Sequence, residues 1–162
     1  MTKIVIFGNS GSGKSSLAKR LAQEKSLAQL DLDTIAWQPG MPPQRLPLSE
    51  SMALINTFTQ QNSQWVNEGC YADLLELVLP EASELIYLNL PIDACVENAR
   101  KRPWEPHKYP SKEAQDANLA MLIDWIQQYH DRNDTFSQST HARLFAQYDG
   151  RKVMYTSNQH VT

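Results

Sequence analysis

The chain has 162 residues, of which 41% are hydrophobic and 20% are charged, and its formal net charge is −3. This length fits a single domain, residues 1–162, and the composition excludes a disordered chain. The negative charge gives no electrostatic support for nucleic-acid binding, and no apolar run approaches the length of a membrane span. Cys70 and Cys95 lack metal-ligand spacing and are typical of reduced thiols, so we expect a cytoplasmic protein.

The first local signal in the chain is also the most specific one. An apolar run at 3–7 predicts a strand, and residues 14–25 predict a helix. Between them, GNSGSGKSS fits G-x-x-x-x-G-K-[ST], the phosphate-binding P-loop or Walker A motif. Glycines turn backbone N–H groups inward, Lys14 can contact the phosphates, and the Ser15 hydroxyl can ligate Mg²⁺. We therefore expect ATP and Mg²⁺ to bind here, with the nucleotide contacted by Gly8, Asn9, Ser10, Gly11, Ser12, Gly13, Lys14, Ser15 and Ser16.

The rest of the chain alternates between strand and helix signals. Strands are expected at 28–33, 64–69, 84–91 and 151–156. Helices are expected at 50–61 with Ser49 as N-cap, and at 71–79, 92–102, 113–129 and 141–148. Prolines predict irregular segments at 34–43 and 103–110. The alternation predicts an α/β fold in which helices cover both faces of a parallel sheet.

Carboxylates follow two of the expected strands. Ligands of such sheets bind at the carboxyl ends of the strands, so Asp31, Asp33 and Glu68 are expected beside the P-loop. Alternation would place Asp31 and Asp33 on the same side of one strand. Asp33 could order Mg²⁺ through water or accept the proton of an acceptor hydroxyl, and its structural alternative is a turn cap. Glu68 is expected to ligate the metal with Ser15. For Asp31, a structural role is at least as well supported as a functional one.

With these residues identified, the chain resembles P-loop kinases of the nucleoside monophosphate kinase and shikimate kinase group. It is most similar to bacterial adenylate-kinase-like proteins, some of which are named for modulation of DNA topology. The resemblance covers nearly the whole chain and rests on GNSGSGKSS, LDLDTIAWQPG at 30–40, WVNEGCY at 65–71, LIYLNLP at 85–91, and Arg100 with Arg102. It implies a three-layer P-loop fold with five parallel strands in the order 2-3-1-4-5. It also implies an acceptor-binding flap at 33–62 and a lid-like insertion at 103–140.

The resemblance also assigns roles outside the P-loop. The expected catalytic residues are Lys14, Asp33 and two lid arginines, Arg102 and Arg132. The alternative for the arginines is that they are only solvated, as is common near a helix end or in a loop. Adenine would lie near 157–159. The family usually has Asp where this chain has Glu68, and again Asp where it has Asn89. The second difference removes a carboxylate.

The resemblance implies an ATP-dependent kinase that transfers the γ-phosphoryl group to a nucleoside monophosphate or a hydroxylated metabolite. Its partner would be this small-molecule acceptor, with no membrane and no nucleic acid, and the sequence indicates no oligomeric state. The alternative on the same fold is a nucleotide-binding regulatory protein or slow ATPase, which Asn89 would suit. A GTPase switch is excluded because the chain has no N-K-x-D tetrapeptide.

Overall fold

The computed structural model describes residues 1–40 and 43–160, so positions 41 and 42 of the predicted flap and the last two residues lie outside it. The strands are β1 (Lys3–Gly8), β2 (Ala28–Asp31), β3 (Trp65–Gly69), β4 (Glu84–Leu88) and β5 (Arg151–Tyr155). The helices are α1 (Lys14–Lys25), α2 (Asp33–Ala36), α3 (Leu48–Gln61), α4 (Ala72–Val78), α5 (Ile92–Lys101), α6 (Lys112–Gln127) and α7 (Gln138–Gln147). Short 3₁₀ turns follow at η1 (Leu79–Glu81) and η2 (Asn158–His160).

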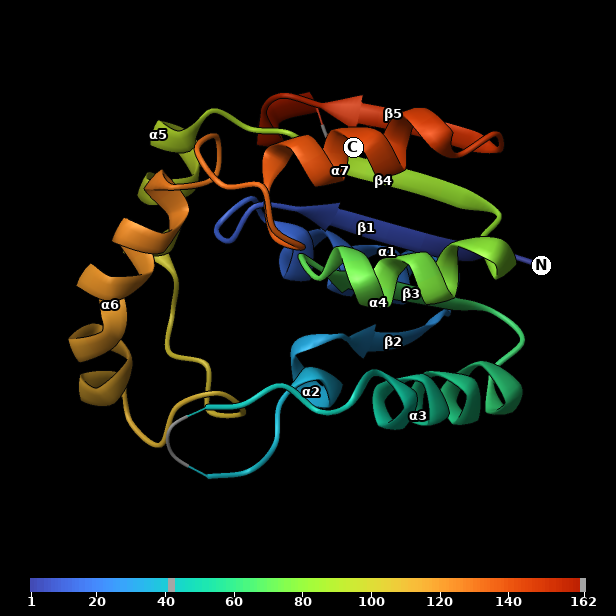
Figure 1. Ribbon diagram of the computed structural model, residues 1–162, viewed down its shortest axis with the longest axis horizontal. Coiled ribbons are helices and arrows are strands. Elements are labelled where there is room, and N and C mark those ends of the chain that lie inside the picture. Colours follow the sequence, from blue (N-terminus) through green and yellow to red (C-terminus); the bar gives the residue numbers. More distant parts are fainter. Residues whose placement is uncertain (41–42, 161–162) are drawn as a thin grey trace.

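The strands form one parallel sheet in the order β2-β3-β1-β4-β5, which confirms the predicted topology (Figure 1). The register pairs Asp31 with Glu68, Phe7 with Gly69, and Gly8 with Leu88. The carboxyl ends of these four strands therefore lie at one edge, where a parallel α/β sheet places its ligands.

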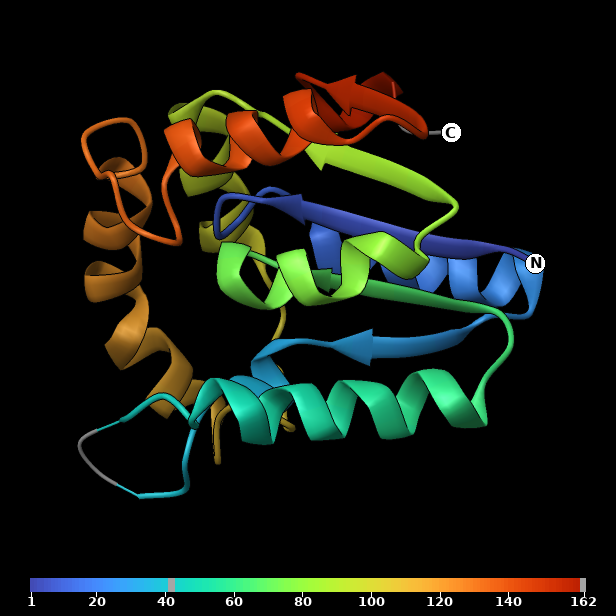
Figure 2. The ribbon, with the colours of Figure 1, turned by 45° about the vertical axis from the view of Figure 1, so that its right-hand side comes forward.

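Helices cover both faces of the sheet, as predicted (Figures 1 and 2). Successive residues of β1 alternate between two apolar layers: Val5 and Phe7 pack with α3, α4 and α7, while Ile4 and Ile6 pack with α1, α5 and α6. All four side chains are buried, which explains why this central strand is a continuous apolar run. No helix in the described part of the chain has the length and hydropathy that a membrane crossing requires.

The second strand is shorter than predicted, and this changes the place of Asp33. The strand ends at Asp31, and Asp33 is the first residue of α2. Asp31 causes the turn, since its Oδ1 accepts the Asp33 N–H at 2.9 Å and its carbonyl accepts the Thr34 hydroxyl at 2.6 Å. The prediction that Asp31 and Asp33 alternate along one strand is therefore wrong, and 34–43 is not wholly irregular.

Two helix starts also differ from the prediction. Helix α3 begins at Leu48 after Pro47, whose carbonyl accepts the N–H groups of Glu50 and Ser51, so Ser49 lies inside the helix rather than capping it. Proline suits such a position because it has no N–H of its own to satisfy. Helix α7 begins at Gln138, because the Ser137 hydroxyl accepts the N–H of Thr140 at 3.2 Å.

Helix α6 stands across the carboxyl edge of the sheet in both views (Figures 1 and 2). Its Ser111 N-cap accepts the Ala114 N–H at 3.1 Å. Ile126 in its last turn is fully buried in the layer that contains α1 and α5, whereas Met121 is 70% exposed. Helix α6 is therefore packed on the body of the protein at one end, and the segment before it runs toward α2 (Figure 1).

Candidate functional site: an anion-binding loop beside a carboxylate cluster

The loop between β1 and α1 requires glycine at two positions. Gly11 and Gly13 have φ values of +79° and +92°, in the left-handed region that favours glycine. A Cβ atom on Gly11 would lie 2.4 Å from the Cys95 carbonyl oxygen. A Cβ atom on Gly13 would lie 2.8 Å from Nδ2 of Asn158. Backbone conformation and crowding therefore explain both Gly13, a fixed position of the motif, and Gly11, a position that the motif leaves open.

Asparagine side chains hold the outer side of this loop. Asn98 Nδ2 donates to the Gly11 carbonyl at 2.9 Å, and Asn158 Nδ2 donates to the Ser12 carbonyl at 3.0 Å. Asn9 Nδ2 donates to the Ile126 carbonyl at 3.1 Å, which ties the loop to α6. Asn158 lies in the segment expected near adenine. No sequence motif includes Asn98, so its contact with the loop could not be predicted from the sequence.

The amino end of α1 is arranged to receive an anion. Among the described residues no side chain caps this helix, and its first turn carries no acidic residue. Its first residue is Lys14, a cation at the positive end of the helix dipole, which is unfavourable unless an anion is bound there. Lys14 Nζ reaches across the loop to the Asn9 carbonyl at 2.8 Å. The Ser12 hydroxyl oxygen is buried without a hydrogen-bond partner in residues 1–40 and 43–160. These features fit a triphosphate.

The two residues expected at the metal, Ser15 and Glu68, lie next to each other, and their role as metal ligands stays a prediction. Ser15 Oγ donates to Glu68 Oε1 at 3.0 Å, and Glu68 is 2% exposed. Burial, and then the Asp31 carboxylate, raises the pKa of Glu68 to about 8, against the lowering effect of Lys14. Within the described chain, no three His, Cys, Asp or Glu side chains could hold a metal ion by themselves. Ser15 and Glu68 fit the usual Mg²⁺ arrangement, in which phosphate oxygens complete the metal ligands.

Asp33 lies in a network that includes a lysine from the lid-like segment. Lys108 Nζ lies 2.8 Å from Asp33 Oδ2 and 3.4 Å from Asp31 Oδ2. The Tyr71 hydroxyl donates to Asp33 Oδ1 and accepts the indole N–H of Trp37 at 2.8 Å. Burial alone would raise the pKa of Asp33, but Lys108 and Tyr71 outweigh burial and lower it. Asp33 is therefore ionised, and Lys108 is a site residue that the sequence motif did not indicate.

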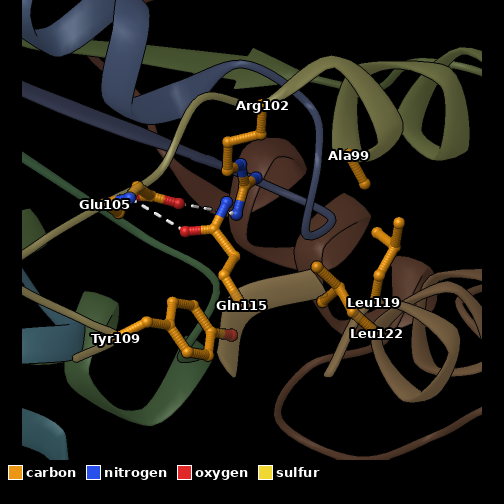
Figure 3. A pocket seen from close by; sticks show the side chains of 7 residues that line it. All are labelled: Ala99, Arg102, Glu105, Tyr109, Gln115, Leu119 and Leu122. Atoms are coloured by element: carbon orange, nitrogen blue, oxygen red, sulfur yellow. Dashed lines mark hydrogen bonds and ion pairs between the residues drawn. The ribbon is translucent and has the colours of Figure 1, made fainter. Parts of the chain in front are cut away.

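Arg102 joins this network through an acid (Figure 3). Its guanidinium lies 3.3 Å from Glu105 Oε1, and Glu105 Oε2 lies 3.6 Å from Lys108 Nζ. Gln115 of α6 accepts the Glu105 N–H at 2.8 Å, and its side chain points toward the same acid (Figure 3). Arg102 is thus linked to Asp33 by a continuous series of ion pairs.

Arg132 has a different environment. Its guanidinium stacks over Trp125 at 3.4 Å, and its Nε donates to Asp134 Oδ2 at 2.9 Å. The contacts of its side chain lie within residues 125–136. The structure therefore does not bring Arg132 into contact with the P-loop or with Asp33, and its predicted catalytic role stays a prediction.

A buried polar chain connects the lid-like segment to the sheet. His141 is fully buried, and its Nε2 lies 2.8 Å from the Cys70 carbonyl, which can only accept. The Nδ1 atom therefore accepts the Tyr129 hydroxyl at 2.7 Å, and Tyr129 in turn bonds to Tyr87 at 2.9 Å. Asn89 accepts from Gln138 Nε2 at 3.2 Å. These hydrogen bonds hold α7 and the end of the lid-like segment at the carboxyl edge of the sheet.

The sheet order and the loop after β1 define the fold of P-loop kinases. The chain is similar to the shikimate kinase of Bacteroides thetaiotaomicron, with a TM-score of 0.52, 15% identity, and coverage of 96% of this chain and 86% of that chain. It is also similar to an unliganded sugar kinase from a Janibacter species, with a TM-score of 0.54, 16% identity, and coverage of 96% and 85%. No protein-family model and no curated protein matches the chain. Identities this low establish the fold alone.

Proposed function

We propose that this protein is an ATP-dependent phosphotransferase, a small-molecule kinase related to the adenylate-kinase-like group, that acts in the cytoplasm. The observation that carries the proposal is the uncapped, lysine-bearing amino end of α1, where exposed Ser15 donates to the buried Glu68. An anion site and a metal site within one hydrogen bond of each other suit a metal–triphosphate complex better than either ligand alone. The two kinase neighbours of the same fold agree with it.

Each residue of the site has one task in the proposed reaction. Lys14 and the N–H groups at 11–16 would hold the phosphates, and Ser15 and Glu68 would hold Mg²⁺, which would neutralise phosphate charge. Asp33, held by Tyr71 and Lys108, orients the acceptor hydroxyl and accepts its proton. The acceptor oxygen bonds to the γ-phosphorus while the bond from that phosphorus to the β–γ bridging oxygen breaks, and ADP leaves with the bonding electrons.

The lid-like segment 103–140 would exclude water during transfer, and 33–62 would hold the acceptor. Arg102 would reach the moving phosphoryl group after release from Glu105, and Arg132 after release from Asp134. Both roles need a rearrangement of existing ion pairs. Lys14 and Asp33 act where they already lie.

The test measures ADP formation from MgATP with a panel of hydroxyl-bearing and phosphate-bearing acceptors. Asp33→Asn should lower the acceptor-dependent rate by roughly 100-fold or more, the usual range for a lost general base, and leave ATP affinity within a factor of about three. Asp124→Asn, an exposed change on α6, is the control. An unaltered acceptor-dependent rate in Asp33→Asn would contradict the assigned role. ADP formation that no acceptor accelerates would favour the slow ATPase or nucleotide-binding regulator.

A further inference from the structure

The two sides of the proposed reaction centre differ in their charge. On the nucleotide side, α1 has an uncapped amino end and a lysine as its first residue. On the acceptor side, residues 33–62 contain one cationic residue, Arg45. A phosphate-bearing acceptor needs free cations or N–H groups, and arginine is the residue best suited to bind it. Whether Arg45 is free therefore bears on the class of acceptor.

Arg45 is already occupied by the protein. One terminal nitrogen lies 3.2 Å from both carboxylate oxygens of Asp73, and Nε donates to the Ala36 carbonyl at 3.2 Å. The guanidinium carbon also lies 4.8 Å from the centre of the Tyr71 ring and 5.9 Å from that of Trp37. Asp73 neutralises this cation, and the two rings hold it in place.

The backbone donors in the first turn of α4 are occupied as well. The first turn of α4 follows β3 at the same edge of the sheet, where a helix could bind an anion. The N–H groups of Ala72 and Asp73 bond to the carbonyl and hydroxyl of Thr135, each at 2.9 Å. The N–H of Leu74 bonds to Asp73 Oδ1 at 2.9 Å. Unlike α1, this helix offers no open amino end to a phosphate.

In the part of the chain that the structure describes, the two cations linked to Asp33 are paired with carboxylates as well. The ammonium of Lys108 is surrounded by Asp33, Asp31 and Glu105, at 2.8, 3.4 and 3.6 Å. Arg102 shares Glu105 with it. A phosphate placed beside Asp33 would meet three carboxylates and only two cations, so one negative charge is left unbalanced there.

The same surface is well suited to hydroxyl groups. Carboxylates accept hydrogen bonds from hydroxyls, and the side chains of Asp31 and Asp33 are 15% and 39% exposed at the carboxyl edge of the sheet. Trp37 next to them is 39% exposed and offers an apolar ring face to the carbon skeleton of a ligand. We propose that the acceptor is an uncharged polyhydroxylated molecule, such as a sugar, a polyol or a nucleoside, and not a nucleoside monophosphate or another phosphate ester. This inference rests on the proposed kinase function.

The first experiment compares the affinity of ATP with that of diadenosine pentaphosphate, which carries phosphates from the nucleotide side into the acceptor side. Calorimetry with Mg²⁺ should give affinities within about threefold of each other, because the acceptor side gives the added phosphates no free cation. Asp73→Asn frees Arg45 and keeps an oxygen for the Leu74 N–H, so it should raise the affinity for the pentaphosphate at least about tenfold. Glu76→Gln removes the same charge elsewhere on α4 and should change neither affinity.

The second experiment compares initial rates of ADP formation with adenosine against AMP, and with ribose against ribose 5-phosphate. We expect the uncharged member of a pair to be used at least about 100-fold more efficiently, since like charges brought together in a site are strongly disfavoured. Pentaphosphate binding to the unaltered protein 100-fold tighter than ATP, or preferred use of a phosphate ester, would overturn the inference while the kinase function stands. No gain in Asp73→Asn would overturn it too. Failure of both ATP and the pentaphosphate to bind would overturn the proposed function itself.

Discussion

The most direct prediction concerns Lys14, whose removal should weaken ATP binding while leaving the protein folded. In the folded protein two effects of Lys14 oppose each other. Its charge at the amino end of α1 is unfavourable by about 0.3–1 kcal/mol. Its hydrogen bond to the Asn9 carbonyl at 2.8 Å is favourable by about 1.5–3 kcal/mol as a charge-assisted bond. Because these partly offset each other, Lys14→Ala should lower the free energy of unfolding by about 0.5–2.7 kcal/mol.

The same substitution removes a charge-assisted contact with the triphosphate. Loss of about 1.5–3 kcal/mol corresponds to a roughly 10- to 150-fold weaker affinity for ATP. Calorimetric titration with MgATP measures the affinity, and urea denaturation measures the stability. Lys19→Ala, an exposed lysine on the same helix, is the matched control and should alter neither. An ATP affinity of Lys14→Ala equal to that of the unaltered protein would refute the assignment of this loop as the nucleotide site.

Three further predictions concern the loop, the buried histidine and the lid-like segment. Gly13→Ala should destabilise the protein by about 1–3 kcal/mol in urea unfolding, because the added Cβ meets Asn158 at a positive φ; an unchanged midpoint would contradict this. Burial lowers the pKa of His141 from 6.5 to about 4, so stability present above pH 6.5 is lost as the pH falls to 4, by about 3 kcal/mol. His141→Gln should flatten that pH dependence of urea unfolding, and an equally steep curve would refute it. Lys108→Ala removes the contact between the lid-like segment and Asp33, so it should speed hydrogen exchange at 103–111. Unchanged exchange would show that other contacts hold the segment.

Sequence alone determined the parts of this protein that depend on neighbouring residues. The P-loop could be predicted because its glycines, Lys14 and Ser15 lie within eight residues, and each is accounted for by local backbone geometry or by the proposed ligand. The sheet order came from the family resemblance, supported by the alternation of strands and helices. The rule that parallel strands carry ligands at their carboxyl ends then placed Glu68 near the loop, where it bonds to Ser15.

Sequence failed where a short side-chain interaction competed with a pattern. Asp31 ended its strand by accepting the Asp33 N–H, a local bond that a period-two pattern of apolar residues does not reveal. Ser49 matched the preferred residue type for a helix cap, but the helix begins two residues earlier than predicted, at Leu48 after Pro47. The turn at Asp31 places Asp33 at the start of a short helix and not at the end of a strand.

Only the tertiary structure decided which charges in the site are paired. Lys108 meets Asp33 across 75 positions of sequence, and Arg45 meets Asp73 across 28. Such pairs depend on how the lid-like segment and the flap pack at the edge of the sheet, and no spacing rule connects their members. Since a paired cation and a free one have the same letter in the sequence, the charge presented to an acceptor follows from the fold.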